Sequence, residues 1–352
     1  MPHRSPVPGR GALVQDFLFA VLHGLRHRPR SIPPKYFYDA AGSHLFDLIC
    51  ATPEYYLTRT ETAILESFGK QMAELIGEAC MLIELGSGSA IKTPMLLHHL
   101  MEDSVYIPID ICESHLMQST LRLQAMFPSL RMRPLCADYM RLPLIDLNEH
   151  ASMRRVIFFP GSTIGNCTPD EARQLLQHAY KLAGDGGAML IGVDSTKSPD
   201  ILNAAYNDAS GHTAAFNRNL LMRMQYELGA QLEPDGFAHY AYYNAPLGRI
   251  EMHLVSQRRQ NILLDGELFQ FKQGESIHTE NSYKYTVQEF QQLARAAGWH
   301  PKMTWHDRDG LFCVHYLGQQ PGWGGQLQFR SQVGSFGKHV GCFWHRAALW
   351  SL

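Results

Sequence analysis

Apolar and polar positions follow two alternating periods along the first half of the chain. Helical spacing of apolar residues recurs at 60–79, 91–102, 113–127 and 170–183. Short apolar runs typical of buried strands lie between these segments, at 81–85, 105–110, 130–138, 153–161 and 188–194. Strands that alternate with helices in this way predict an α/β fold, in which a parallel sheet is covered by helices on both faces.

The pattern changes after Asp194. The stretch 203–221 reads NAAYNDASGHTAAFNRNLL, with many polar side chains and no single apolar stripe. Amphipathic strands are expected after it, at 237–244, 249–256, 260–264 and 267–275, with a hairpin turn at Asp265-Gly266. A helix at 287–298 and a strand pair within 302–317 then complete the α/β pattern. The simplest interpretation is an insertion, residues 197–286, after the fifth strand of the α/β domain.

Composition narrows the class of protein. The 352 residues include 31 basic and 33 acidic side chains, so no excess of positive charge indicates a nucleic-acid partner. The chain has neither 18 consecutive apolar residues nor a signal-peptide core, so no membrane partner is expected. Its seven cysteines form no CxxC pair, which favours reduced thiols over disulfides or zinc. We expect a cytoplasmic protein without a metal, and a solvated turn at the basic residues 26–30.

A glycine-rich turn follows the first apolar strand, in the sequence Glu84-Leu85-Gly86-Ser87-Gly88-Ser89. Glycines at this place let the backbone approach a ligand at the carboxyl end of a sheet. The third glycine of the dinucleotide fingerprint is missing. The next two strands end in Asp110 and Asp138, where carboxylates can bind ribose hydroxyls and an adenine amino group. Alternatively, both aspartates only cap helices.

The turn and the two strand-end aspartates together resemble the class I S-adenosylmethionine methyltransferases, which have a Rossmann-like sheet. The resemblance implies S-adenosylmethionine as the cofactor, with no metal. The cofactor-binding residues expected on this basis are Glu84, Gly86, Ser87, Gly88, Lys92, Asp110 and Asp138.

Four longer segments, 33–61, 158–172, 192–221 and 277–285, carry a closer resemblance. They are similar to the histidine-specific Nα-methyltransferases of ergothioneine biosynthesis, and the likeness extends over roughly residues 15–318. It implies a methyltransferase domain and an inserted α+β substrate domain. The expected bounds are 61–196 plus 287–318 for the first and 1–60 plus 197–286 for the second, and the tail 319–352 has no assigned role.

The resemblance also implies roles for individual residues around the substrate. These are Tyr55, Asn166 and Tyr206 at the α-carboxylate end, Tyr38, Phe46 and the Gly161 backbone beside the amino group, and Glu280, Ser282 and Met252 around the imidazole. Without the resemblance, the tyrosines and Met252 would be read as core residues. Asn166 would be a turn residue, and the pair Glu280 and Ser282, which share a face of a strand, would be a solvated edge.

The expected reaction is the transfer of three methyl groups to the α-amine of L-histidine, which gives trimethylhistidine (hercynine). Only a neutral amine can attack, and no matched His or Lys is an obvious base, so we expect proton release to water assisted by Tyr38. Two alternatives stay open. One is methylation of another aromatic amino acid such as tryptophan, and the other is a non-catalytic protein that binds S-adenosylmethionine. A monomer is the default expectation.

Overall fold

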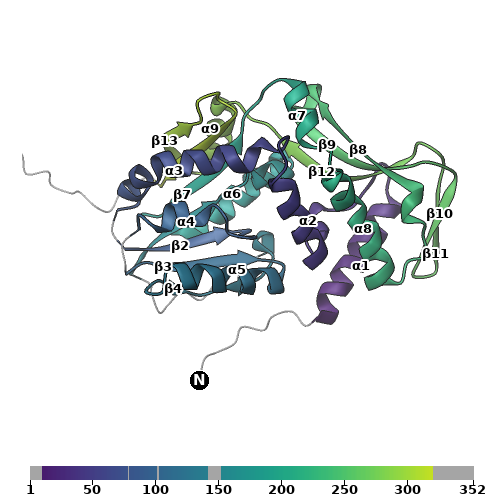
Figure 1. Cartoon of the computed structure of the whole chain (residues 1–352), viewed down its shortest axis with the longest axis horizontal. Coiled ribbons are helices and arrows are strands. Elements are labelled where there is room, and N and C mark those ends of the chain that lie inside the picture. Colours follow the sequence, from purple (N-terminus) through teal and green to yellow (C-terminus); the bar gives the residue numbers. More distant parts are fainter. Residues whose placement is uncertain (1–9, 78, 101–102, 142–151, 320–352) are drawn as a thin grey trace, which may run out of the picture. The chain divides into compact units, whose positions relative to one another are not determined.

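The computed structural model describes residues 10–77, 79–100, 103–141 and 152–319 (Figure 1). Apart from Gln319, the predicted tail 319–352 lies outside the described residues. Two separate sheets, together with a hairpin, account for the strands of the described part.

The larger sheet has eight strands in the order β13-β14-β7-β6-β2-β3-β4, with β5 also paired to β3. Its strands are β2 (Cys80–Leu85), β3 (Val105–Asp110), β4 (Arg131–Met132), β5 (Leu135–Cys136), β6 (Arg154–Phe159), β7 (Ala188–Asp194), β13 (His300–His306) and β14 (Phe312–Gly318). Strands β2 to β7 run parallel, as predicted, whereas β14 is antiparallel to both β7 and β13. The single strand expected at 130–138 is wrong, because Arg133 and Pro134 separate two short strands.

Helices cover both faces of this sheet, as predicted. They are α3 (Tyr56–Ile76), α4 (Thr93–Leu97), α5 (Glu113–Met126), α6 (Pro169–Ala183) and α9 (Val287–Ala296). Alternate residues of each strand belong to two apolar clusters: Leu82 shares one with Leu65 of α3, and Ile83 shares the other with Leu176 of α6. Helix α4 begins later than the expected residue 91, because Pro94 is tolerated only in a first helical turn, and it ends at Leu97, before the expected residue 102.

The smaller sheet has the order β1-β12-β9-β8, and β10 and β11 form the separate hairpin. The bounds are β1 (Arg30–Ser31), β8 (Phe237–Asn244), β9 (Arg249–Ser256), β10 (Gln260–Leu264), β11 (Glu267–Phe271) and β12 (Ser276–Tyr283). Asp265 and Gly266 both have positive φ, 50° and 78°, as a tight two-residue hairpin turn requires, so that prediction is confirmed.

Helices α1 (Arg10–Arg26), α2 (Ala40–Cys50), α7 (Pro199–Ala205) and α8 (His212–Leu228) accompany this sheet in Figure 1. The polar residues of 203–221 mostly bond within the protein. Asp208 accepts from the backbone N–H groups of His212 and Thr213, which starts α8. Asn217 donates to the backbone of His253, and so ties α8 to β9.

The solvated turn expected at the basic residues 26–30 is confirmed for 26–29, which are exposed, but it is wrong for the last residue. Arg30 is buried, with its guanidinium 3.9 Å from the centre of the Phe271 ring. It also donates to the backbone oxygens of Leu25 and Gln270. A planar guanidinium can stack on an aromatic ring while its N–H groups stay bonded, which explains this burial.

The insertion leaves and re-enters the larger sheet at neighbouring points, because the N–H of Tyr285 donates to the backbone oxygen of Asp194. The two sheets use the chain segments expected for two domains, but the division into domains stays a prediction. In the described part of the chain, no helix has both the length and the apolar character needed to cross a membrane.

Candidate active site

Two cavities adjoin between the sheets. The larger has a volume of about 600 Å³ and is lined by residues of both sheets. All of the expected cofactor-binding residues line it, namely Glu84, Gly86, Ser87, Gly88, Lys92, Asp110 and Asp138. One ligand-sized space is therefore bordered by the carboxyl ends of the parallel strands β2 and β3 and by the segment that follows β5.

The turn after β2 fits a bound ligand. Gly86 and Gly88 have φ values of 69° and 52°, which side chains other than glycine rarely adopt. The Gly88 N–H donates to Asp110 over 2.8 Å, so the turn is fixed. Between the two glycines, the Ser87 hydroxyl is buried without a hydrogen-bond partner. A buried unpartnered hydroxyl on a cavity wall is suited to a polar ligand such as the expected cofactor.

The strand-end aspartates have partners within the protein but keep lone pairs for a ligand. Asp110 accepts from the N–H of Cys112, the residue just before α5, so it fixes the entry to the helix and does not cap an N–H group within it. Asp138 accepts from the N–H of Met140 and forms an ion pair with Lys35, at 3.1 Å. An ionised carboxylate offers about four acceptor positions, so these bonds leave room for ribose hydroxyls or an amino group.

Glu84 and Lys92 use their charged groups on the protein itself. Glu84 accepts from the hydroxyls of Thr93 and Tyr106, and burial raises the pKa of its carboxyl to about 7. Lys92 forms an ion pair with the buried Glu61 of α3. Both residues therefore brace the wall of the larger cavity, and direct contact with a cofactor stays a prediction for them.

The smaller cavity is lined by the residues expected around the substrate: Tyr38, Phe46, Tyr55, Gly161, Asn166, Tyr206, Met252, Glu280 and Ser282. Several of them also line the larger cavity: Tyr38, Phe46, Tyr55, Gly161, Asn166 and Glu280. The two spaces thus meet at these shared residues. Segments that are far apart in the sequence converge at this cavity. The family resemblance implied this convergence, whereas local sequence patterns did not predict it.

Aromatic rings form one wall of the smaller cavity. Tyr38 and Phe46 meet edge to face, with centroids 5.7 Å apart, and Tyr55 meets Tyr206 at 6.1 Å. Burial raises the pKa of Tyr38 well above its usual value, so its phenol keeps its proton. Sequence reasoning missed Phe216, whose ring lies 5.5 Å from that of Tyr38, although it belongs to a matched segment.

Strand β12 supplies the polar wall. Glu280 and Ser282 both line the smaller cavity, and Met252 lies opposite Glu280 on β9. Burial raises the pKa of Glu280 to about 7. Asn281, whose orientation could not be inferred from the sequence, lines the larger cavity and has a buried side-chain oxygen without a partner.

Tyr206 already has a hydrogen-bond partner within the protein, and its contact with a substrate carboxylate stays a prediction. Its hydroxyl donates to Oγ of Ser282 over 2.7 Å. A phenol has one proton, so Tyr206 can donate to a substrate carboxylate only if this bond is exchanged. Sequence reasoning also missed Lys284, which donates to Ser282 over 2.7 Å and to Tyr206 over 3.2 Å. The available signal was its position two residues after Ser282, on the same face of the chain.

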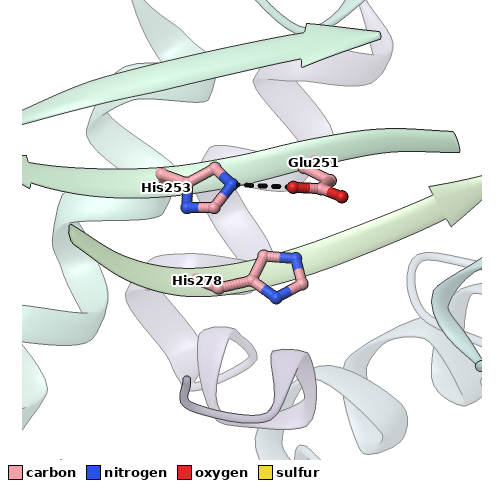
Figure 2. Close-up of side chains that lie close together, drawn as sticks. All are labelled: Glu251, His253 and His278. Atoms are coloured by element: carbon pink, nitrogen blue, oxygen red, sulfur yellow. Dashed lines mark hydrogen bonds and ion pairs between the residues drawn. The ribbon is translucent and has the colours of Figure 1, made fainter. Parts of the chain in front are cut away.

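Figure 2 shows a cluster of Glu251, His253 and His278, whose possible ligand atoms lie within 4.8 Å of one another. The Glu251 carboxylate already accepts from Arg249, Tyr242 and His253. Burial opposes its charge, but these hydrogen bonds lower its pKa to about 2. The two imidazole rings are stacked, with centroids 4.9 Å apart, so their in-plane lone pairs do not converge. The cluster is better suited to a hydrogen-bond network than to a metal ion.

Comparison with known proteins identifies the family to which this chain belongs. The model of the SAM-dependent histidine-specific methyltransferases matches residues 17–319. The histidine N-alpha-methyltransferase of Mycolicibacterium smegmatis is 37% identical over 300 residues, which cover 82% of this chain and 90% of that protein. The namesake from Mycobacterium tuberculosis is 37% identical over 321 residues, with 88% and 96% covered. An L-tryptophan methyltransferase of Psilocybe serbica is 27% identical over 326 residues, with 84% and 90% covered. With its cavities and this match over most of its length, the chain belongs to the family of SAM-dependent, histidine-specific methyltransferases.

Proposed function

We propose that this protein transfers methyl groups from S-adenosylmethionine to the α-amine of L-histidine, three times, and so makes hercynine for ergothioneine biosynthesis. The observation that carries the proposal is the junction of the two cavities. A small space with an aromatic wall, a carboxylate and a hydroxyl shares lining residues with a larger space that suits the cofactor. The names of the two mycobacterial relatives support histidine as the substrate.

When bound in the larger cavity, S-adenosylmethionine supplies an electrophilic methyl group on its sulfonium. The residues of this chain hold the amine at the junction and exclude water from the smaller cavity. Tyr38 stays a neutral phenol, so its oxygen accepts a hydrogen bond from the amine rather than removing a proton as a phenolate. Each proton then leaves to water through the larger cavity. The rings of Phe46 and Tyr38 tolerate the fixed positive charge of the product.

At the side-chain end of the substrate, Glu280 and Ser282 recognise the imidazole through hydrogen bonds. The carboxylate accepts from one ring N–H, and the hydroxyl donates to the other ring nitrogen. The relative from Psilocybe serbica keeps tryptophan as the second candidate substrate. An indole has one N–H and no acceptor, so it would leave the Ser282 hydroxyl unpaired in a buried site.

Mass spectrometry after incubation with S-adenosylmethionine and either L-histidine or L-tryptophan tests the proposal. We expect one, two and then three added methyl groups on histidine, and little product from tryptophan. Methylation of tryptophan alone would contradict the substrate assignment. Calorimetric binding of S-adenosylhomocysteine without any methylated product would instead support the non-catalytic alternative.

The quaternary state and location belong to the same proposal. We propose a cytoplasmic monomer that binds neither nucleic acid nor membrane, with one domain for the cofactor and one for the amino acid. The near balance of 31 basic and 33 acidic residues supports the absence of a nucleic-acid partner. Light scattering coupled to size exclusion should give the mass of a single chain, and the mass of a dimer would contradict the monomer.

A further inference from the structure

Lys284 has a buried ammonium group next to the smaller cavity. Its side chain is fully buried, and its Nζ lies 2.7 Å from a carboxylate oxygen of Asp194. The other hydrogen bonds of this ammonium go to the hydroxyls of Ser282 and Tyr206. Its three N–H donors are therefore all used. Burial works against the charge of Lys284, but the adjacent Asp194 carboxylate outweighs this effect and raises its pKa.

The two hydrogen bonds that Ser282 accepts determine the direction in which its hydroxyl proton points. Its Oγ accepts from Lys284 over 2.7 Å and from Tyr206 over 2.7 Å. A hydroxyl has two acceptor positions and one proton, so both acceptor positions are filled. The proton must then point away from both donors, and Ser282 lines the smaller cavity. The cavity therefore offers a ligand a hydrogen-bond donor at this position, rather than an acceptor.

We propose that Lys284 is a specificity-determining positioning residue, which fixes Ser282 as a donor so that the cavity selects rings presenting an acceptor nitrogen. The inference rests on the proposed function, since it assumes that an imidazole occupies the smaller cavity. Glu280, on the same strand, supplies the complementary acceptor for the ring N–H. Together they select the neutral imidazole with one donor and one acceptor.

Lys197 provides a matched control. It also pairs with Asp194, at 2.6 Å, and its side chain is nearly as buried, but its other bonds go to Tyr56 and the backbone oxygen of Ser195. Lys197→Met thus removes a cation from the same carboxylate without removing a donor to Ser282. A general effect of the buried charges would appear in both variants, whereas a positioning effect would be confined to Lys284→Met.

The test compares two histidine analogues with five-membered rings. L-4-Thiazolylalanine keeps an acceptor nitrogen, whereas L-2-thienylalanine has no ring nitrogen. We expect the wild type to prefer the thiazolyl analogue in kcat/KM by about tenfold or more, because the thienyl ring leaves a buried donor unpaired. In Lys284→Met and in Ser282→Ala, the ratio should fall to within about threefold of one. Lys197→Met should keep the wild-type ratio, and Lys284→Met in the Ser282→Ala background should change it no further.

The outcomes separate this inference from the proposed function. A wild type that methylates histidine but shows no preference between the analogues, or equal losses in Lys284→Met and Lys197→Met, would overturn the role of Lys284 alone. A wild type that does not methylate histidine overturns the proposed function. Binding of S-adenosylhomocysteine, which uses the other cavity, checks that each variant is folded. If Lys284→Met does not fold, Lys284→Leu, which also has no donor, replaces it, and an unchanged ratio there would contradict the inference.

Discussion

The backbone N–H of Gly161 donates to Oε2 of Glu61 over 2.8 Å, which links the junction of the two cavities to helix α3. Glu61 is fully buried, and the same oxygen forms an ion pair with Lys92. A side chain at Gly192 would not fit here, because its Cβ would lie 2.0 Å from the other oxygen of Glu61. Glu61 was not among the predicted site residues, yet it holds the position of one of them.

Glu61→Ala should lower the free energy of unfolding by about 2–3 kcal/mol, because it leaves a buried N–H and a mostly buried ammonium without their partner. Urea unfolding of the ligand-free protein measures this. Glu66→Ala on the exposed side of the same helix is the control and should stay within about 0.5 kcal/mol of the wild type. Equal effects of the two substitutions would show that the buried network contributes nothing.

The pH dependence of catalysis should reflect Glu280. Burial raises its pKa to about 7, so the carboxylate that accepts the ring N–H is present above that pH and is lost below it. We expect kcat/KM for histidine to fall by about tenfold per pH unit below pH 7, beyond the decline due to protonation of the substrate. The Glu280→Gln side chain cannot titrate, so the kcat/KM of this variant should show only the decline that is due to protonation of the substrate. The pH profiles of the two proteins, measured side by side, provide the check, and superimposable profile shapes would contradict this role.

Much of the fold follows from local patterns, and the remainder depends on contacts that such patterns do not encode. The apolar runs at 81–85 and 105–110 were sufficient to place β2 and β3, and parallel strands necessarily bring Gly86 and Asp110 to one edge. Arg30 looked solvated because its burial depends on Phe271, in a strand far along the chain. Tyr206 and Ser282 were assigned to opposite ends of the substrate, since nothing in either segment shows that they bond to each other.

Tyr38→Phe should slow methyl transfer while leaving the cofactor bound. The phenol stays neutral, so its loss removes a hydrogen-bond acceptor for the amine, and it does not remove a titrating base. We expect all three transfers to slow by about tenfold to a hundredfold, and binding of S-adenosylhomocysteine to change by less than about threefold. Single-turnover reactions followed by mass spectrometry resolve the three steps. Unchanged rates for all of them would contradict the proposed part of Tyr38 in the mechanism.

Gly165→Ala should separate the two walls of the smaller cavity. Gly165 lies in the short 3-10 helix η4 (Thr163–Asn166), where a Cβ would meet the backbone oxygen of Tyr283 in β12 at 2.8 Å. The added methyl group must push η4 and its Asn166 away from Ser282, because backbone atoms cannot turn aside as a flexible side chain can. We expect a loss of about 1–3 kcal/mol in unfolding free energy and a KM for histidine raised by at least about tenfold. The KM for S-adenosylmethionine should change much less, since the turn at Gly86 and Gly88 lies in another segment.

Gly266→Asn is the control for a glycine substitution, because Gly266 lies in the β10–β11 hairpin turn, where asparagine tolerates positive φ. A KM for histidine that stays at the wild-type value in Gly165→Ala would show that the close approach of η4 to β12 does not set the shape of the substrate cavity.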